Sequence, residues 1–186
     1  MTLRRSLELS AVLILIQGAA LWMMGHPVIC RCGYVKIWEN SVWTANDSQH
    51  LADWYSLGHL NHGILFAVLF AALLRRWSVP ARLLANTLTG FAWEVTENSD
   101  MIIKRFRAQT ISFNYYGDSV INSMSDSVFM VVGFLIAMRL PWWVSLLIFF
   151  GIEALTTWLV RDGLIIDTIM LIHPIEAIKA WQIAGH

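Results

Sequence analysis

The stretch LGHLNHGILFAVLFAALLRRW, residues 57–77, holds a long apolar run that ends at two arginines and a tryptophan. A helix needs about 20 mostly apolar residues to cross a bilayer, and this stretch is long enough. Its first turns carry His59 and His62, which are ionisable groups of a kind that is rare inside a bilayer. The stretch therefore predicts a membrane-spanning helix with polar chemistry at one end.

The rest of the chain has a membrane-like composition. Hydrophobic residues make up 57% of the 186 residues and charged residues 14%, whereas a soluble domain carries roughly 25% charged residues. The ten tryptophans also favour a bilayer, because indole rings gather at membrane–water interfaces. The net charge of zero gives no electrostatic reason for nucleic acid to bind, and no nucleic-acid partner is expected.

Similar apolar segments predict an all-α helical bundle that forms a single membrane domain over residues 1–186. The expected spans are residues 7–24, 57–74, 81–103, 119–138 and 142–160. The apolar stretch 163–172 is too short to cross, which favours a re-entrant or interfacial segment. Residues 26–56 and 104–118 are polar and are expected to be loops on one side of the membrane.

Arginines in the shortest connections set the expected orientation. Arg4 and Arg5 precede the first span, and three more arginines crowd the connection between the second and third spans. Lysine and arginine concentrate in cytoplasmic loops. We therefore expect a bacterial inner-membrane protein with a cytoplasmic N-terminus, and with the loops 26–56 and 104–118 in the periplasm.

This topology brings the ionisable residues of several helices to a similar depth in the outer leaflet. Charged groups that face lipid cost on the order of 2.5–3.5 kcal/mol each, so such residues normally turn inward. Glu153 is a further ionisable residue on this side and lies deeper in its helix than the others. We expect one shared cavity to hold the candidate catalytic residues His59, His62, Glu94, Glu97 and Asp126.

Three uses of this cluster remain open. In an acid–base site, a histidine with Glu94 would move protons, and Glu97 and Asp126 would orient the histidine and Glu94. In a metal site, mixed nitrogen and oxygen ligands would suit a divalent transition metal such as zinc, manganese or iron. In a structural network, the same groups would only hold helices together. The candidate metal ligands are His59, His62, Glu94 and Glu97.

The polar loop before the fourth span offers groups for an anionic substrate. Guanidinium groups bind phosphate with paired donors, although cations at this depth also anchor proteins to lipid phosphates. The candidate substrate-binding residues are Lys104, Arg105, Arg107, Asp118, Ser119 and Asn122.

Cys30 and Cys32 lie in the first polar loop and are separated by one residue. An intramolecular disulfide of this spacing is strained. A disulfide, two reduced thiols and a soft-metal site with His26 or His50 therefore all remain open.

Two segments carry a resemblance to known proteins. The runs WEVTENS, residues 93–99, and GDSVINSMSD, residues 117–126, resemble the VanZ-like group of small membrane proteins. The chain differs from that group at Glu97, where the group often has glutamine, and in carrying two histidines in its second span. The positions that match the group's motif are Glu94, Glu97, Arg105 or Arg107, Asp118 and Asn122.

The whole chain resembles an uncharacterised family of small proteobacterial inner-membrane proteins more closely, through SQHLADWY, HLNHG, WEVTENS and YYGDSVINSMSD. The resemblance to the VanZ-like group implies a role in the cell envelope. We expect an outer-leaflet cavity that binds or processes a lipid-linked or phospholipid substrate. The alternatives are a non-catalytic subunit or assembly factor with a membrane-protein partner, and a metal- or haem-binding membrane protein.

Overall fold

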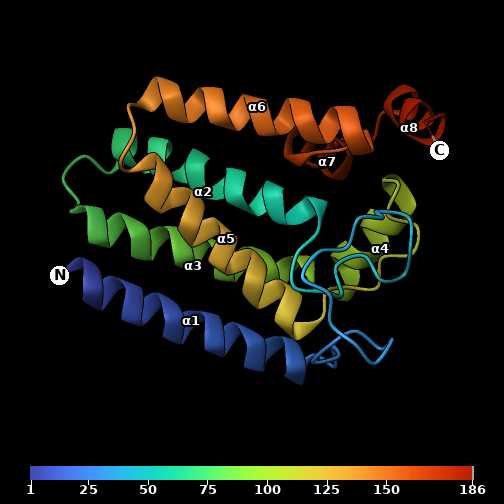
Figure 1. The fold of residues 1–186 in the computed structure, drawn as a ribbon, viewed down its shortest axis with the longest axis horizontal. Helices are drawn as coiled ribbons and strands as arrows, with labels where there is room; N and C mark the ends of the chain where they lie inside the picture. The colour runs from blue at the N-terminus through green and yellow to red at the C-terminus, as the bar shows by residue number, and fades with distance from the viewer. Residues whose placement is uncertain (186) are drawn as a thin grey trace.

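The computed structural model describes residues 1–185, which form eight helices and no strand, so the predicted all-α fold is confirmed. Five long helices run side by side along the longest axis, and the shorter helices and long loops gather at the end opposite the N-terminus (Figure 1). The helices are α1 Leu3–Met23, α2 Trp54–Leu73, α3 Val79–Glu97, α4 Asp100–Gln109, α5 Val120–Ala137, α6 Trp142–Val160, α7 Leu164–Ile172 and α8 Glu176–Ile183.

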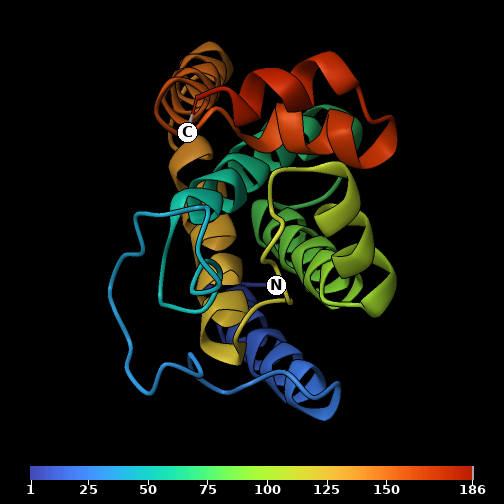
Figure 2. The same cartoon turned by 90° about the vertical axis from the view of Figure 1, so that its right-hand side faces the viewer.

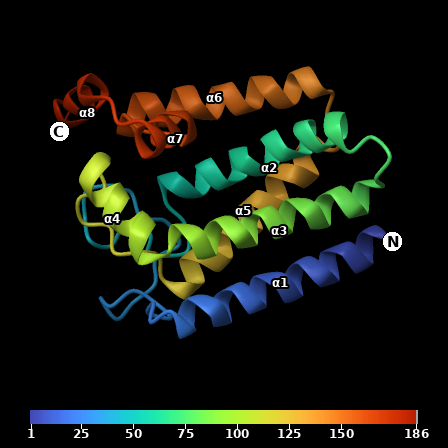
Figure 3. The ribbon, with the colours of Figure 1, turned by 180° about the vertical axis from the view of Figure 1, so that it is seen from behind.

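Four of these helices, α1, α2, α5 and α6, are long and apolar enough to cross a membrane. The helix α3 has a similar length, but it carries Arg82, Glu94 and Glu97 and is less apolar. It contacts α1, α2 and α5, as the view from behind shows (Figure 3). Neighbouring helices therefore cover much of its polar surface.

The third expected span, residues 81–103, is divided in the structure. α3 ends at Glu97, and residues 100–109 form the separate short helix α4. The Asn98 amide donates to the Glu94 carbonyl oxygen at 3.0 Å and to Asp118 Oδ2 at 2.7 Å. Side-chain bonds of this kind compete with the helical backbone, and they explain why the helix stops in ENSD, where apolar periodicity gave no boundary.

The helices α2 and α5 make the closest contact in the bundle, at two glycines. A Cβ atom on Gly63 would collide with the Met130 carbonyl oxygen, and one on Gly133 would collide with the Leu60 carbonyl oxygen. Small residues allow helix backbones to approach this closely. Next to this crossing lies the main apolar core, which includes Ile64, Ala67, Leu83, Val131, Phe134, Ala137 and Phe149.

Buried polar side chains join the helix α1 to α3 and α5. Gln17 Nε2 donates to the Ser123 carbonyl oxygen at 2.9 Å, and Ser127 Oγ donates to Gln17 Oε1 at 2.7 Å. The hydroxyls of Ser10 and Thr87 lie 2.8 Å apart. Hydrogen bonds between helices replace the hydrophobic effect where both faces would otherwise contact lipid.

The loop between α1 and α2 covers one side of the far end of the bundle, while α4 covers the other side (Figure 2). Cys30 and Cys32 form a disulfide in this loop. Gln49 attaches the loop to the start of α5, because its amide donates to the Gly117 carbonyl oxygen at 2.7 Å. This end of the molecule is therefore an ordered cap over the helix ends.

Candidate functional site

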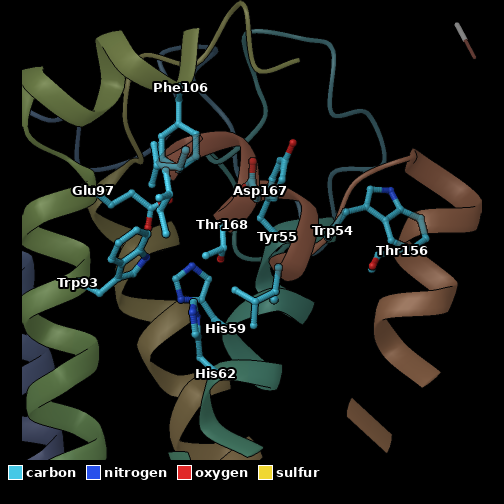
Figure 4. A pocket seen from close by; sticks show the side chains of 15 residues that line it. Trp54, Tyr55, His59, His62, Trp93, Glu97, Phe106, Thr156, Asp167 and Thr168 are labelled. Atoms are coloured by element: carbon cyan, nitrogen blue, oxygen red, sulfur yellow. The ribbon is translucent and has the colours of Figure 1, made fainter. Parts of the chain in front are cut away.

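A cavity of about 240 Å³ lies at the capped end of the bundle, between α2, α3, α4 and α7. Apolar side chains form most of its walls, among them Trp54, Trp93, Phe106, Leu164 and Leu171. Figure 4 shows the polar side chains that project into it from α2, α3 and α7. These polar residues include His59, His62, Glu97, Asp167 and Thr168.

The start of α2 fixes where its histidines point. Asp53 caps the helix by accepting hydrogen bonds from the backbone nitrogens of Tyr55 and Ser56, and the Ser56 hydroxyl accepts from the Asp53 nitrogen. This capping box fixes the helix start, so that His59 and His62, three residues apart, share one face. Figure 4 shows both imidazoles in the cavity.

Glu94 lies fully buried behind His59. Its Oε1 is 3.2 Å from His59 Nδ1, and its Oε2 accepts a hydrogen bond from Ser123 Oγ at 2.7 Å. Within residues 1–185, Glu94 Oε1 and Glu97 Oε2 are buried and have no hydrogen-bond partner. Glu94 Oε1 therefore lies next to the His59 ring without forming a hydrogen bond to it.

A second, smaller void of about 20 Å³ adjoins the same residues. A void of this size holds roughly one water molecule. Asp126 reaches it from α5 and is held there by Ser56, whose Oγ donates to Asp126 Oδ1 at 2.5 Å. The ionisable side chains around the void are Tyr55, His59, Glu97, Tyr115, Asp118, Asp126 and Asp167.

The cluster has an unbalanced set of charges. In the described part of the chain, the lysines and arginines that form ion pairs do so with Glu8, Glu39 and Asp100, all outside the cluster. Burying an ionised carboxylate without a cationic partner costs several kcal/mol. The carboxyl groups of the cluster are therefore neutralised by protons or by a bound cation.

The structure thus brings four of the five candidate catalytic residues to the two voids, with Glu94 directly behind them. Glu153 lies elsewhere, because Asn61 Nδ2 donates to its Oε1 at 2.8 Å and the Ile165 nitrogen donates to its Oε2 at 2.9 Å. Glu153 therefore joins α2, α6 and α7.

The predicted cationic residues do not line the cavity. Arg105 donates to the carbonyl oxygens of Leu171 and Ile172 and so holds the end of α7. Arg107 lies over the Tyr116 ring at 4.5 Å, and Lys104 is 3.6 Å from Asp100.

The other three predicted substrate-binding residues lie at the start of α5 or just before it, against the loop between α1 and α2. Ser119 caps α5 and donates to the Gln49 carbonyl oxygen at 3.0 Å, and Asn122 donates to the His50 carbonyl oxygen at 2.9 Å. Asp118 accepts from Asn98 and Tyr115 and touches the small void. Burial raises the pKa of Asp118 from its usual 3.8 to about 7, although both hydrogen bonds oppose this shift.

Asp167 is the main site residue that sequence reasoning missed. It lies on α7, within the apolar run LIIDTIMLI, and lines both voids. The available signal was a single carboxylate inside an otherwise apolar segment, and such a residue is a candidate for function. Only the structure shows that Asp167 lies beside the site residues of α2 and α3, because α7 is far from these helices in the sequence.

The fold and the site define a class of protein: a bundle with four membrane-length apolar helices and a cavity of imidazole and carboxyl groups at one end. The chain belongs to the DUF2585 family, described as "Protein of unknown function", whose family model matches residues 21–184.

The UPF0314 proteins are close relatives. The chain is 49% identical over 183 residues to a UPF0314 protein of Paracoccus denitrificans, covering 97% of this chain and 95% of the relative. It is 44% identical over 181 residues to one of Sphingopyxis alaskensis, covering 95% and 94%. The predicted membership in an uncharacterised proteobacterial family is confirmed. No solved structure matches the chain.

Proposed function

We propose that this protein spans the bacterial inner membrane with five helices and binds or processes a lipid-linked or phospholipid envelope substrate. Four helices have the necessary length and composition, and α3 would be the fifth. Its 19 residues extend over about 28 Å, which is close to the thickness of the hydrocarbon core. The short helix α7 would enter the outer leaflet beside α2 without crossing it.

The residues that line the 240 Å³ cavity are the observation that supports a lipid-like substrate. Its apolar walls suit a hydrocarbon chain, and polar side chains from α2, α3 and α7 project into it. Ligand sites typically combine mostly apolar walls with a few polar groups that fix orientation. An amphiphile whose polar head lies at His59 and Glu97, and whose chain extends past Leu171 and Ile172, matches this distribution.

His59 and Glu94 together would supply a general base for the proposed reaction. A carboxylate beside one ring nitrogen favours the tautomer with the proton on that nitrogen. When no cation lies between Glu94 and Nδ1, the Nε2 atom of His59 is free to take a proton from a head group or a water molecule. The VanZ-like resemblance supports the same envelope role, and Glu94 is one of the positions that carry it.

Single cysteines test the proposed orientation. In a background with Cys30 and Cys32 replaced by serine, Ser78→Cys lies between α2 and α3, and Lys104→Cys lies on α4 at the capped end. We expect a membrane-impermeant thiol reagent to label Lys104→Cys but not Ser78→Cys in intact spheroplasts. Labelling of Ser78→Cys alone would reverse the orientation and place the cavity in the inner leaflet.

Filling the cavity tests the proposed ligand. Thr168 lines the cavity, whereas its neighbour Ile169 does not, so Thr168→Trp and Ile169→Trp form a matched pair on α7. We expect mass spectrometry of native-purified protein to find a retained lipid in the parent and in Ile169→Trp. Thr168→Trp should lose most of it. Equal lipid content in all three proteins would contradict a lipid-binding cavity.

A further inference from the structure

Three side chains from two helices have ligand atoms close together beside the cavity. One ligand atom from each of His59, Glu94 and Glu97 lies within 4.8 Å of the other two. The Glu94 Oε1 to His59 Nδ1 distance of 3.2 Å nearly equals the separation of about 3.3 Å between two ligands in a tetrahedral site with bonds of about 2.0 Å. Small side-chain rotations would bring Glu97 to the same distance.

Buried oxygens without a donor give a second, independent observation. Glu94 is fully buried, and neither its Oε1 nor Glu97 Oε2 has a hydrogen-bond partner among the described residues. Most buried polar atoms have such a partner, so orphaned carboxylate oxygens that converge on one imidazole need another explanation. A cation bound between them would satisfy both oxygens and the ring nitrogen together.

We infer that His59, Glu94 and Glu97 bind one divalent transition-metal ion whose remaining coordination positions face the cavity. One imidazole and two carboxylates are mixed nitrogen and oxygen ligands, which suit zinc, manganese or iron(II). A catalytic metal site has three protein ligands and an open position, and this set has that size. Ser123 completes the arrangement by fixing Glu94 through Oε2.

The ligand set differs from the sequence-based candidates in excluding His62. The His62 ring stacks on Phe66, with ring centroids 6.0 Å apart, and it lies beside Trp93 at 6.2 Å. It lines the cavity but does not belong to the group of converging ligand atoms. His62 therefore contacts the substrate side of the site, not the metal.

The metal would also explain how the cavity could accept an anionic head group. This consequence rests on the proposed function. The cavity contains Glu97 and Asp167 but no lysine or arginine of the described residues. An anionic head group would be repelled by these carboxylates. A divalent cation offsets the charge of the two carboxylates that bind it and can coordinate a phosphate or carboxylate oxygen directly. The site would then accept an anionic lipid head group.

Metal binding is tested with the full chain in detergent, after chelation and dialysis and without added lipid. Zn²⁺ is titrated by calorimetry, and bound metal is counted by elemental analysis. We expect one Zn²⁺ for each parent chain. His59→Ala and Glu97→Gln should bind with affinities lowered well beyond the ~10–100-fold effect of losing an outer-shell partner. His62→Ala, one turn away on the same helix, should bind within a few-fold of the parent.

Mn²⁺ allows the imidazole ligand of the metal to be detected directly. Pulsed electron paramagnetic resonance of the Mn²⁺-loaded parent should detect one coordinated imidazole nitrogen, and His59→Ala should lose this signal while His62→Ala keeps it. Circular dichroism identifies any variant that fails to fold, and Glu97→Gln keeps the size of the side chain.

No stoichiometric Zn²⁺ in the parent, or unchanged binding in both His59→Ala and Glu97→Gln, would overturn the metal site. The metal titration uses chelated protein without added lipid, and the lipid test with Thr168→Trp uses native-purified protein, so failure of either proposal can be recognised separately.

Discussion

The two halves of helices α2 and α5 differ in how they are packed and in what they contain. Toward the N-terminal end of the bundle, Ile64 and Phe134 are fully buried in the apolar core, and glycines bring the two backbones into contact. Toward the capped end, the same helices carry His59 and Asp126 beside open space. One half is filled by side chains, and the other encloses a mostly apolar cavity into which polar groups project.

This difference separates the source of stability from the candidate site. Substitutions that remove or add side-chain volume are most destabilising where apolar side chains are closely packed. Buried carboxyl groups without cationic partners reduce stability, and proteins keep them where function requires them. The packed half therefore predicts large structural effects of substitution, and the polar half predicts effects on function with little structural loss.

The largest expected effect comes from the glycine contact in the packed half. Gly133→Leu would place a side chain against the backbone at Leu60, which cannot move without separating α2 from α5. We expect loss of folded, monodisperse protein in detergent, because the clash exceeds the ~1–3 kcal/mol of ordinary overpacking. Gly151→Leu is the matched control, since a Cβ atom there meets nothing within 4 Å.

Equal yield and equal unfolding temperature for Gly133→Leu and Gly151→Leu would show that folding does not depend on the close α2–α5 contact. Fluorescence-detected size exclusion followed by thermal unfolding measures both quantities.

The second effect concerns function in the polar half. Glu94→Gln and Asp126→Asn retain shape and most hydrogen bonds, but neither amide can ionise or bind a metal as an anion. We expect both variants to reach normal membrane levels and to fail to restore whatever envelope phenotype a deletion strain shows. Glu8→Gln changes an exposed carboxylate on α1 and should complement fully.

Full complementation by both buried amide variants would remove the catalytic interpretation. Loss of both protein level and function would instead favour a structural network.

A smaller effect is expected from pH, through a carboxyl group outside the spanning helices. Burial raises the pKa of Asp118 from 3.8 to about 7. Between these two values the folded state holds a proton that the unfolded state has released, so stability falls as the pH rises from about 4 to about 7. The contribution is complete below this range and lost above it.

Replacing Asp118 with asparagine removes this titration. The oxygen of the introduced amide can accept a hydrogen bond from Asn98, and the Tyr115 hydroxyl can turn to accept one from the amide nitrogen. We expect thermal unfolding in detergent at pH 5 and pH 8 to differ less in Asp118→Asn than in the parent. An unchanged difference would assign the pH dependence to other groups.

The sequence predicted the outline of the fold because apolar runs of membrane length are a strong physical signal. It also singled out His59, Glu94, Glu97 and Asp126, since charges at bilayer depth must turn inward. The early end of α3 was missed because it depends on the Asn98 side chain and its partner Asp118, 20 residues away.

The site itself was predicted less completely than the helices. Nothing in the short segment 163–172 indicates that Asp167 faces α2, because that contact depends on how α7 folds back. The cations of residues 104–107 were candidates from charge alone, and the structure shows Arg105 bound to backbone carbonyls. Charge identifies a group that needs a partner, whereas only the fold determines which partner it has.

The most direct test of the contrast between the two halves is the thermal unfolding of metal-stripped Glu94→Gln/Asp126→Asn in detergent, beside metal-stripped parent. Both amides can still accept from Ser123 and Ser56, and two buried carboxyl groups without cationic partners are removed. We predict an unfolding temperature equal to or above that of the parent. For a chain of this size ~1 kcal/mol corresponds to about 2–4 °C. A decrease of more than about 5 °C would mean that these carboxyl groups hold the bundle together, which would contradict the assignment of the polar half to function.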